Sequence, residues 1–536
     1  MKFTIAMRRR GKALGAFGVI ALLSAVCANP TSATEKQTPL KPTAIISTEY
    51  GPLRGVVKDG IREYLGIPFA APPVGELRWR PPQPYKKWTE VKDATKFGNQ
   101  CPQLSRGSVV GSEDCLLLNV FAPLNVSPNP PAPVMVWIHG GAMEVGDGSD
   151  YPAASLVKQG VVVVTINYRL GTLGFFAVPS LDRGEQFGNY GLLDQEFALT
   201  WVKNNISKFG GDSDNITVFG QSTGGGSALA LMASPAAKGL FEKAIIQSPA
   251  RSMHLRLNQP SLKSVVARST KVAKAVGCEQ LRASCLRAVS ARELIKQNVS
   301  YPTAFILTGT KVFPQTYQAA FESGKFNRVP VIIGNVRDER TFRYGLMQGG
   351  SPTNTLTAEG YKAELHSSFG ESANAVLGKY PLQNYGSPTR ALSAATSDAY
   401  MICRSHVLNK ILSKWVPIYA YEFADRTAPV ALPTVSFTYG AYHTGEIAYL
   451  FHGYKDLKLN PLQMTLSSQM ISYWTTFAKT GNPNSAESPN WPRYGGDNPN
   501  FQVFRLPTAF TQSASAEDAR HSCGFWSQTA YTFPGK

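Results

Sequence analysis

Short apolar runs recur along this chain, and most of them carry no polar residue in alternation. They are rich in β-branched side chains, which is typical of strands buried on both faces in a parallel sheet. A helical pattern separates two of them, because Leu193, Phe197, Trp201 and Ile206 recur at helical spacing within 192–209. Strand, helix and strand in succession predict a βαβ unit. The six runs lie at 134–138, 161–166, 216–219, 244–246, 329–333 and 418–421.

No internal repeat and no interior linker interrupts this pattern. The 536 residues and their 43% hydrophobic content suffice for a large core. We therefore expect a single α/β domain over 44–536, with a large, mostly parallel central sheet flanked by helices and interrupted by long insertions.

The N-terminal segment has a different character. Residues 1–12 carry five basic groups and no acid, 13–26 is an apolar run, and Ala28 provides a small residue for cleavage. This layout predicts a signal peptide over 1–28, followed by a flexible polar leader over 29–43. The alternative is an uncleaved membrane anchor. With the signal removed, we expect a secreted or periplasmic protein without stable membrane insertion.

The charge balance adds little to this prediction. Of the net charge of +18, five positive charges lie in the predicted signal, so the remainder carries +13. This excess favours solubility, or a mild preference for anionic substrates. Histidines and cysteines lack the spacing of metal motifs, and no nucleic-acid motif is present. We therefore predict no metal, no cofactor and no nucleic-acid partner.

Six cysteines remain after Cys27 leaves with the signal. An even number in an exported chain predicts disulfides. Counting alone leaves all 15 pairings open. The six are Cys101, Cys115, Cys278, Cys285, Cys403 and Cys523.

The strongest chemical signal is Gly220-Gln221-Ser222-Thr223-Gly224, which lies between an apolar run and an Ala/Leu-rich helical stretch. Strand, G-x-S-x-G and helix in that order predict a nucleophile elbow, in which a tight turn exposes the serine hydroxyl. Taken alone, the five residues could equally form a surface turn.

The surrounding motifs resemble those of the type-B carboxylesterases, the group within the α/β-hydrolase superfamily that includes the cholinesterases. The resemblance covers about Gly51 to Trp526 and implies the α/β-hydrolase fold and ester hydrolysis. The motifs are Tyr64-Leu-Gly-Ile-Pro-Phe-Ala-Ala-Pro-Pro-Val-Gly-Glu-Leu-Arg78, Ser112-Glu-Asp-Cys-Leu-Leu-Leu-Asn119, Trp137-Ile-His-Gly-Gly141, Asn167-Tyr-Arg-Leu-Gly171 and Gly188-Asn-Tyr-Gly-Leu-Leu-Asp-Gln195.

A serine nucleophile needs a base and an orienting acid, which in this superfamily follow the serine in the order acid, then histidine. His443 lies in Gly440-Ala-Tyr-His-Thr-Gly-Glu446, which resembles the catalytic-histidine loop, whereas His452 lies in an apolar stretch and is expected to be structural. Glu339 takes the position of the orienting acid, and its neighbour Asp338 is the competing choice.

The resemblance also implies an oxyanion hole formed by the backbone N–H groups of Gly140, Gly141 and Thr223. Three residues depart from the family pattern: Gln221 replaces a glutamate, Thr223 an alanine and Arg340 a glycine. None of these changes removes a proposed catalytic group.

Disulfides and ion pairs are likewise implied by the resemblance, and not by spacing. The disulfides are Cys101–Cys115, Cys278–Cys285 and Cys403–Cys523. The ion pairs are Arg78–Glu113 and Arg169–Asp194, with structural roles.

The expected function is an exported serine ester hydrolase acting on a small-molecule ester. One alternative is a non-catalytic adhesion or binding protein, against which the intact Ser222, Glu339 and His443 argue. Another is acyl transfer to an alcohol. The segment between Cys101 and Cys115 holds no aromatic residue. Choline esters are therefore not expected as substrates, because a quaternary ammonium binds on aromatic faces. The sequence predicts no oligomeric state.

Overall fold

A computed structural model of the chain describes residues 40–125, 129–181, 188–249, 261–298, 300, 303–349, 353, 355–486, 488–496 and 499–529. The predicted signal peptide over 1–28 and most of the predicted leader over 29–43 lie outside these residues. The first strand, β1 (Lys41–Pro42), lies in the last residues of the predicted leader. It pairs antiparallel with β4 (Val56–Lys58).

A twelve-stranded sheet forms the centre of the described part of the chain, in the order β1-β4-β5-β9-β11-β10-β12-β13-β14-β15-β16-β17. The strands from β11 to β16 in this order run parallel, and the strands at both ends pair antiparallel. Bounds of the central strands are β10 (Ala132–Ile138), β11 (Val162–Ile166), β12 (Gly211–Gln221), β13 (Lys243–Gln247), β14 (Val331–Val336) and β15 (Ile418–Phe423). The remaining strands are β5 (Ile61–Pro68), β9 (Leu117–Pro123), β16 (Asn500–Phe504) and β17 (Phe510–Ser513).

All six predicted strand segments are therefore strands of one sheet. The predicted helix over 192–209 is α3 (Tyr190–Asn205), and a short 3₁₀ segment continues it to Phe209. Gly210 ends this segment with a φ of 91°, a left-handed conformation that favours glycine.

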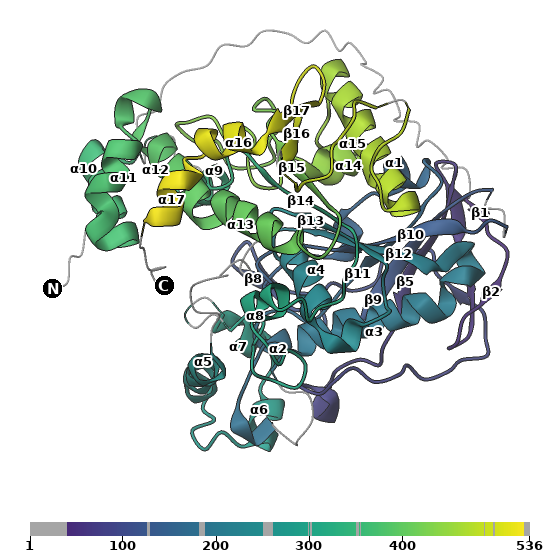
Figure 1. Cartoon of the computed structure of the whole chain (residues 1–536). Helices are drawn as coiled ribbons and strands as arrows, with labels where there is room; N and C mark the ends of the chain where they lie inside the picture. The colour runs from purple at the N-terminus through teal and green to yellow at the C-terminus, as the bar shows by residue number, and fades with distance from the viewer. Residues whose placement is uncertain are drawn as a thin grey trace, which may run out of the picture. The chain divides into compact units, whose positions relative to one another are not determined.

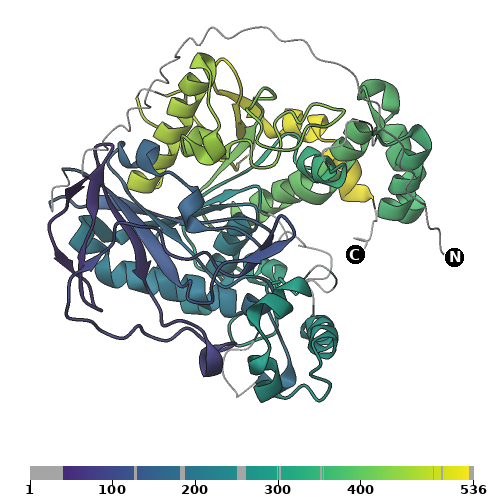
Figure 2. The same cartoon turned by 180° about the vertical axis from the view of Figure 1, so that it is seen from behind.

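Alternate side chains of the central strands enter two hydrophobic cores, one on each face of the sheet. On β10, Val134 and Val136 join the first core, whereas Met135 and Trp137 join the second. Helices α3 and α4 (Thr223–Ala233) cover the first face, and α1 (Ala154–Val157) and α15 (Pro461–Thr480) cover the other (Figures 1 and 2). Burial on both faces explains why these strands lack polar alternation.

A third core lies beside the sheet. It is formed by α10 (Ala358–Phe369), α11 (Ala373–Lys379), α12 (Pro388–Ser397) and α17 (Cys523–Gln528), and includes Trp526. The other helices of six or more residues in the described ranges are α5 (Leu262–Ala275), α6 (Ala283–Ala288), α7 (Ala291–Lys296), α8 (Tyr317–Glu322), α9 (Thr341–Met347), α13 (Cys403–Leu412) and α16 (Ala514–Arg520). None of the helices in these ranges has the length and apolar character to cross a bilayer.

Three disulfides and two ion pairs stabilise this fold, and the disulfide Cys403–Cys523 joins the residues farthest apart in sequence. The cysteines form the three pairs that the resemblance implies: Cys101–Cys115, Cys278–Cys285 and Cys403–Cys523. The two implied ion pairs are also present. Arg78 contacts Glu113 at 2.5 Å, and Arg169 contacts Asp194 at 2.7 Å. Burial makes the loss of either partner costly, because it would leave a charge without compensation.

Candidate active site

Ser222 lies at the turn between β12 and α4, as the G-x-S-x-G pattern predicts. Its backbone adopts φ 59° and ψ −124°, a conformation that is strained for a residue with a side chain. Its N–H donates to the carbonyl of Gln247 at 2.9 Å, which fixes the turn against β13. Although Ser222 stands at the N-cap position of α4, its hydroxyl makes no capping hydrogen bond. The hydroxyl is therefore not committed to the helix.

Glycine is needed on both sides of this serine because the turn lies directly against β10. A Cβ added to Gly220 would come within 2.6 Å of the carbonyl oxygen of Ile138. A Cβ at Gly224 would meet the same oxygen even more closely. Strand β10 therefore packs directly against the turn that carries Ser222. A larger residue at Gly220 or Gly224 would displace this turn.

His443 and Glu339 are joined by a short hydrogen bond. Nδ1 of His443 lies 2.5 Å from Oε2 of Glu339, and both side chains are buried. A carboxylate at Nδ1 accepts a hydrogen bond from the N–H of that nitrogen, which keeps the proton on Nδ1 and leaves Nε2 with its lone pair as a proton acceptor. Nε2 of His443 lies 3.4 Å from the side-chain amide nitrogen of Gln221, the residue before Ser222. The imidazole therefore lies at the elbow.

The second oxygen of Glu339 is also fixed. Oε1 accepts hydrogen bonds from the side-chain amide of Asn335 at 2.8 Å and from the backbone N–H of Val336 at 3.2 Å. Both donors lie on β14, three and four residues before the glutamate. The end of this strand thus orients the carboxylate that orients the imidazole. Asn335 is not part of any motif that the sequence pointed to, although it lies only four residues before Glu339.

Asp338, the competing acid, faces a different set of groups. Its carboxylate contacts Arg390 at 3.1 Å and Arg426 at 3.0 Å, and it accepts a hydrogen bond from the N–H of Ala441 at 2.9 Å. Asp338 thus anchors the loop that carries His443. The carboxylate of Asp338 does not contact the imidazole of His443. The two adjacent carboxylates therefore serve different partners.

The electrostatics at His443 favour a basic imidazole. Burial alone would lower the pKa of His443, but the charge of Glu339 and its hydrogen bond outweigh burial, so the pKa is raised above its ordinary value of 6.5. The positive charge of Arg340 acts in the opposite direction.

Glu446, three residues after His443, is a further buried acid that the sequence analysis did not assign. Burial, followed by the charge of Glu339, raises its pKa to about 7. The quoted histidine motif ends at this residue, so its position was visible in the sequence, but its burial was not.

The Gly140–Gly141 loop lies against the serine. A Cβ added to Gly140 would come within 2.8 Å of the carbonyl oxygen of Gln221 and 3.0 Å of Cβ of Ser222. Gly141 has a φ of 105°. Among the described residues, no acceptor takes the backbone N–H of either glycine. The backbone N–H groups of Gly140 and Gly141 therefore lie beside Ser222 without hydrogen-bond acceptors among the described residues.

Thr223 also contributes to this loop through its side chain. Its hydroxyl accepts a hydrogen bond from the N–H of Met143 at 3.2 Å. The departure from the family's alanine therefore adds a link between the elbow and the glycine loop. The side chain of His452, by contrast, contacts Ser467 at 2.7 Å, which agrees with the structural role expected for it.

A serine held at a strained strand–helix turn on a mostly parallel sheet defines an α/β-hydrolase. Residues 42–526 match the model of the Carboxylesterase family. The chain is 36% identical to the para-nitrobenzyl esterase of Bacillus subtilis over 485 residues, covering 84% of this chain and 92% of that protein. It is 33% identical to the fumonisin B1 esterase of Sphingopyxis macrogoltabida, covering 84% of this chain and 85% of that protein.

A solved structure of a thermophilic PNB esterase superposes with a TM-score of 0.74 at 32% identity, covering 89% of this chain and 99% of the other. The chain therefore belongs to the carboxylesterase family and is a carboxylic ester hydrolase. The fold prediction is confirmed by this superposition.

Replacing Glu339 by glutamine tests its contact with His443. We expect kcat to fall by about 10²–10⁴-fold, because the amide favours the wrong tautomer and no longer stabilises the imidazolium. Since the raised pKa of His443 depends on the charge of Glu339, the acidic limb of kcat/KM against pH should also move to lower pH. The matched variant Asp338→Asn should lose less activity and keep the wild-type limb. The reverse ranking would assign the acid to Asp338.

Replacing Gly140 by alanine tests the glycine loop. The added methyl group would lie too close to Gln221 and Ser222, so the loop must shift away from the serine. We expect kcat to fall by about 10²–10³-fold, the effect of losing an oxyanion donor, with a smaller change in KM. The control is Gly378→Ala on α11, where a Cβ meets nothing within 4 Å. Equal activities of the two variants would contradict an oxyanion role for the loop.

Proposed function

We propose that this carboxylesterase is an exported serine hydrolase in which Ser222 is the nucleophile, His443 the general base and Glu339 the orienting acid. The observation that carries the proposal is the 2.5 Å hydrogen bond between His443 and Glu339, together with the proximity of the imidazole to the elbow. Three segments far apart in the sequence supply these residues.

The proposed reaction proceeds through an acyl-enzyme. Nε2 of His443 takes the proton of Ser222 as the hydroxyl attacks the ester carbonyl, and the N–H groups of Gly140, Gly141 and Thr223 stabilise the oxyanion. The imidazolium then protonates the leaving alcohol. Water, activated in the same way, attacks the acyl-enzyme and releases the acid.

For the substrate, we propose a neutral or anionic small ester and not a choline ester. The ring of Phe342 lies 5.7 Å from that of His443, so one aromatic face is present near the base. However, Phe342 is followed directly by Arg343, and the nearby Arg340 places a positive charge where it acts on His443. A quaternary ammonium gains about 0.5–2 kcal/mol on an aromatic face, and neighbouring positive charges oppose that gain.

The Ser222→Ala variant tests the chemistry. In a folded, purified protein it should lose about 10³-fold or more of ester hydrolysis, because the residual activity comes from binding and the oxyanion hole alone.

The wild type should be assayed with p-nitrophenyl esters, carboxylated esters and butyrylcholine at equal acyl length. Unchanged activity of Ser222→Ala would end the assignment, and a preference for butyrylcholine would refute the substrate class.

Export is supported by the N-terminal pattern and by the three disulfides, which persist in oxidising compartments. We expect the protein recovered from the periplasm or the medium to begin at Asn29. N-terminal sequencing of that fraction measures this directly. Recovery of the chain in the membrane fraction with residues 1–28 still attached would support the uncleaved anchor instead.

A further inference from the structure

Two peptide groups of the glycine loop carry the first two donors of the proposed oxyanion hole. The carbonyl of His139 and the N–H of Gly140 belong to one peptide group. The carbonyl of Gly140 and the N–H of Gly141 belong to the next. Both peptide bonds are trans, and in a planar trans peptide the C=O and the N–H point in opposite directions. A contact that fixes either carbonyl therefore also fixes the direction of the N–H in the same group.

Each of these carbonyls accepts one buried hydrogen bond from a side chain. The hydroxyl of Tyr168 donates to the carbonyl of His139 at 3.0 Å. Nδ1 of His139 lies 2.7 Å from the carbonyl oxygen of Gly140, so Nδ1 carries a proton and donates this hydrogen bond. Burial lowers the pKa of His139, which keeps its ring neutral at pH 7. The ring stacks on that of Tyr168 with centroids 4.5 Å apart, so the two donors hold each other in place.

Thr223 connects this pair to the turn that carries the serine. Its hydroxyl oxygen accepts a hydrogen bond from the N–H of Met143 at 3.2 Å. Burial raises the pKa of Tyr168, and a hydrogen bond from Thr223 opposes that rise, so the Thr223 hydroxyl also contacts the phenol. The side chains of His139, Tyr168 and Thr223 are all buried. The connection depends on the departure from the family's alanine, because alanine has no hydroxyl.

The glycine loop needs such contacts because part of its backbone is strained. Ala142 and Met143 have φ angles of 61° and 60°, a left-handed conformation that residues with a side chain rarely adopt. Conformations of this kind persist only when their surroundings fix them. The N–H groups of Gly140 and Gly141 have no acceptor among the described residues. Their directions therefore depend on the contacts that the neighbouring carbonyls make.

We propose that Tyr168 is a positioning residue for the oxyanion hole and acts together with His139 and the hydroxyl of Thr223. Tyr168 orients the N–H of Gly140, and the ring of His139 orients the N–H of Gly141. Donors that are fixed in advance need no rearrangement when negative charge develops, so they lower the barrier of the chemical step more than they change substrate binding. This inference rests on the proposed function, because it requires an oxyanion formed at Ser222.

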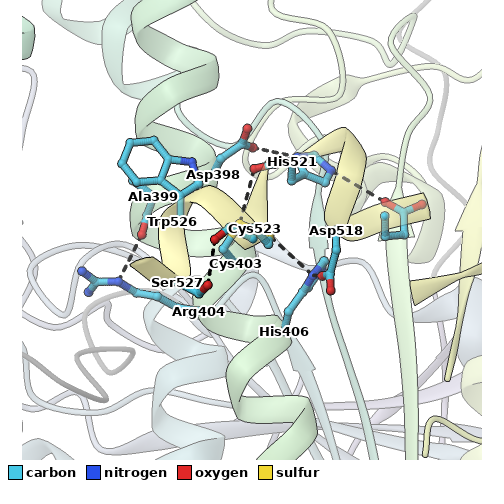
Figure 3. Close-up of a disulfide and its surroundings, with 12 residues drawn as sticks. Asp398, Ala399, Cys403, Arg404, His406, Asp518, His521, Cys523, Trp526 and Ser527 are labelled. Atoms are coloured by element: carbon cyan, nitrogen blue, oxygen red, sulfur yellow. Dashed lines mark hydrogen bonds and ion pairs between the residues drawn. A yellow bond between two sulfur atoms is a disulfide. The ribbon is translucent and has the colours of Figure 1, made fainter. Parts of the chain in front are cut away.

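A second buried histidine makes similar contacts away from the proposed site. His521 donates from Nδ1 to Asp398 at 2.7 Å and from Nε2 to Glu422 at 2.6 Å, so both nitrogens carry protons. Burial alone would lower the pKa of His521, but the two carboxylates raise it to about 10. Figure 3 shows His521 and Asp398 beside the disulfide between Cys403 and Cys523. This cluster around His521 contains no residue of the proposed triad or oxyanion hole, and a matched control lies next to it.

The control is Tyr361 on α10. Its hydroxyl donates to the carbonyl of Tyr380 at 2.8 Å, and the hydroxyl of Tyr380 donates to Asp398 of the cluster around His521. Like Tyr168, Tyr361 is fully buried and donates to a backbone carbonyl. Phenylalanine at either position removes one hydrogen bond of the same kind. Both variants should therefore lower the thermal unfolding midpoint by a similar few degrees, whereas only Tyr168→Phe should alter the chemical step.

The test compares Tyr168→Phe and Tyr361→Phe with the wild type on a p-nitrophenyl ester. We expect kcat of Tyr168→Phe to fall by about 10–10²-fold with little change in KM, because a misdirected donor loses part of the effect of a whole one. The affinity for an aryl trifluoromethyl ketone, which adds to the serine hydroxyl and forms an oxyanion, should fall by a similar factor. Tyr361→Phe should keep the wild-type values of both.

A pair of variants at Thr223 repeats the test from the side of the serine turn. Thr223→Val loses the hydroxyl and keeps the branched shape, whereas Thr223→Ser keeps the hydroxyl. We expect kcat of Thr223→Val to be about tenfold below that of Thr223→Ser at similar KM. This pair decides the question if Tyr168→Phe does not fold by circular dichroism.

Equal kcat and equal ketone affinity in the folded Tyr168→Phe and Tyr361→Phe variants would overturn the inference. If Tyr168→Phe does not fold, equal kcat in the two Thr223 variants would overturn it. An inactive Ser222→Ala together with a fully active Tyr168→Phe would refute this inference alone. Hydrolysis retained in Ser222→Ala would instead refute the proposed function, so the two failures are distinguishable.

Discussion

The strained turn at Ser222 is the constraint on which the rest of the site depends. A residue with a side chain occupies a positive φ there, and the turn persists because its surroundings leave no room for a relaxed alternative. Strand β10 lies against Gly220 and Gly224, while β13 accepts the N–H of the serine. The central strands are buried on both faces, so the sheet that holds the turn is itself rigid. Displacing the elbow would require moving β10 or β13.

The site lies where parallel strands end. Ser222 follows β12 directly, Glu339 follows β14 by three residues, and His443 comes from the long connection after β15. Side chains at the carboxyl ends of parallel strands converge at one edge of the sheet. Within this arrangement, the local environment decides what each carboxylate does. Glu339 receives hydrogen bonds from β14 and contacts the imidazole, whereas its neighbour Asp338 is held by two arginines and by the His443 loop.

Much of this arrangement could be predicted from the sequence, but not all of it. The six apolar runs could be recognised as strands because a strand buried on both faces shows an uninterrupted run of apolar residues in the sequence. Strands nearer the two ends of the sheet left a weaker signal. In β5, buried and half-exposed residues are mixed, and β16 contains polar residues such as Gln502, so neither produced an apolar run. The triad candidates were recognisable from local motifs. The burial of Glu446, the second role of Asp338 and the cluster around His521 depend on contacts between distant segments, which no local pattern records.

The disulfide Cys403–Cys523 has a consequence for the stability of the proposed site. It closes a segment of 120 residues that contains His443 but neither Ser222 nor Glu339. In the chain-entropy model, closing a loop of this length disfavours the unfolded chain by about 4–5 kcal/mol. The proposed general base is thus carried on the part of the chain that this disulfide closes into a loop. In a newly made chain whose thiols are still reduced, that contribution is missing, and oxidation of the pair would favour the folded arrangement in which His443 meets Glu339.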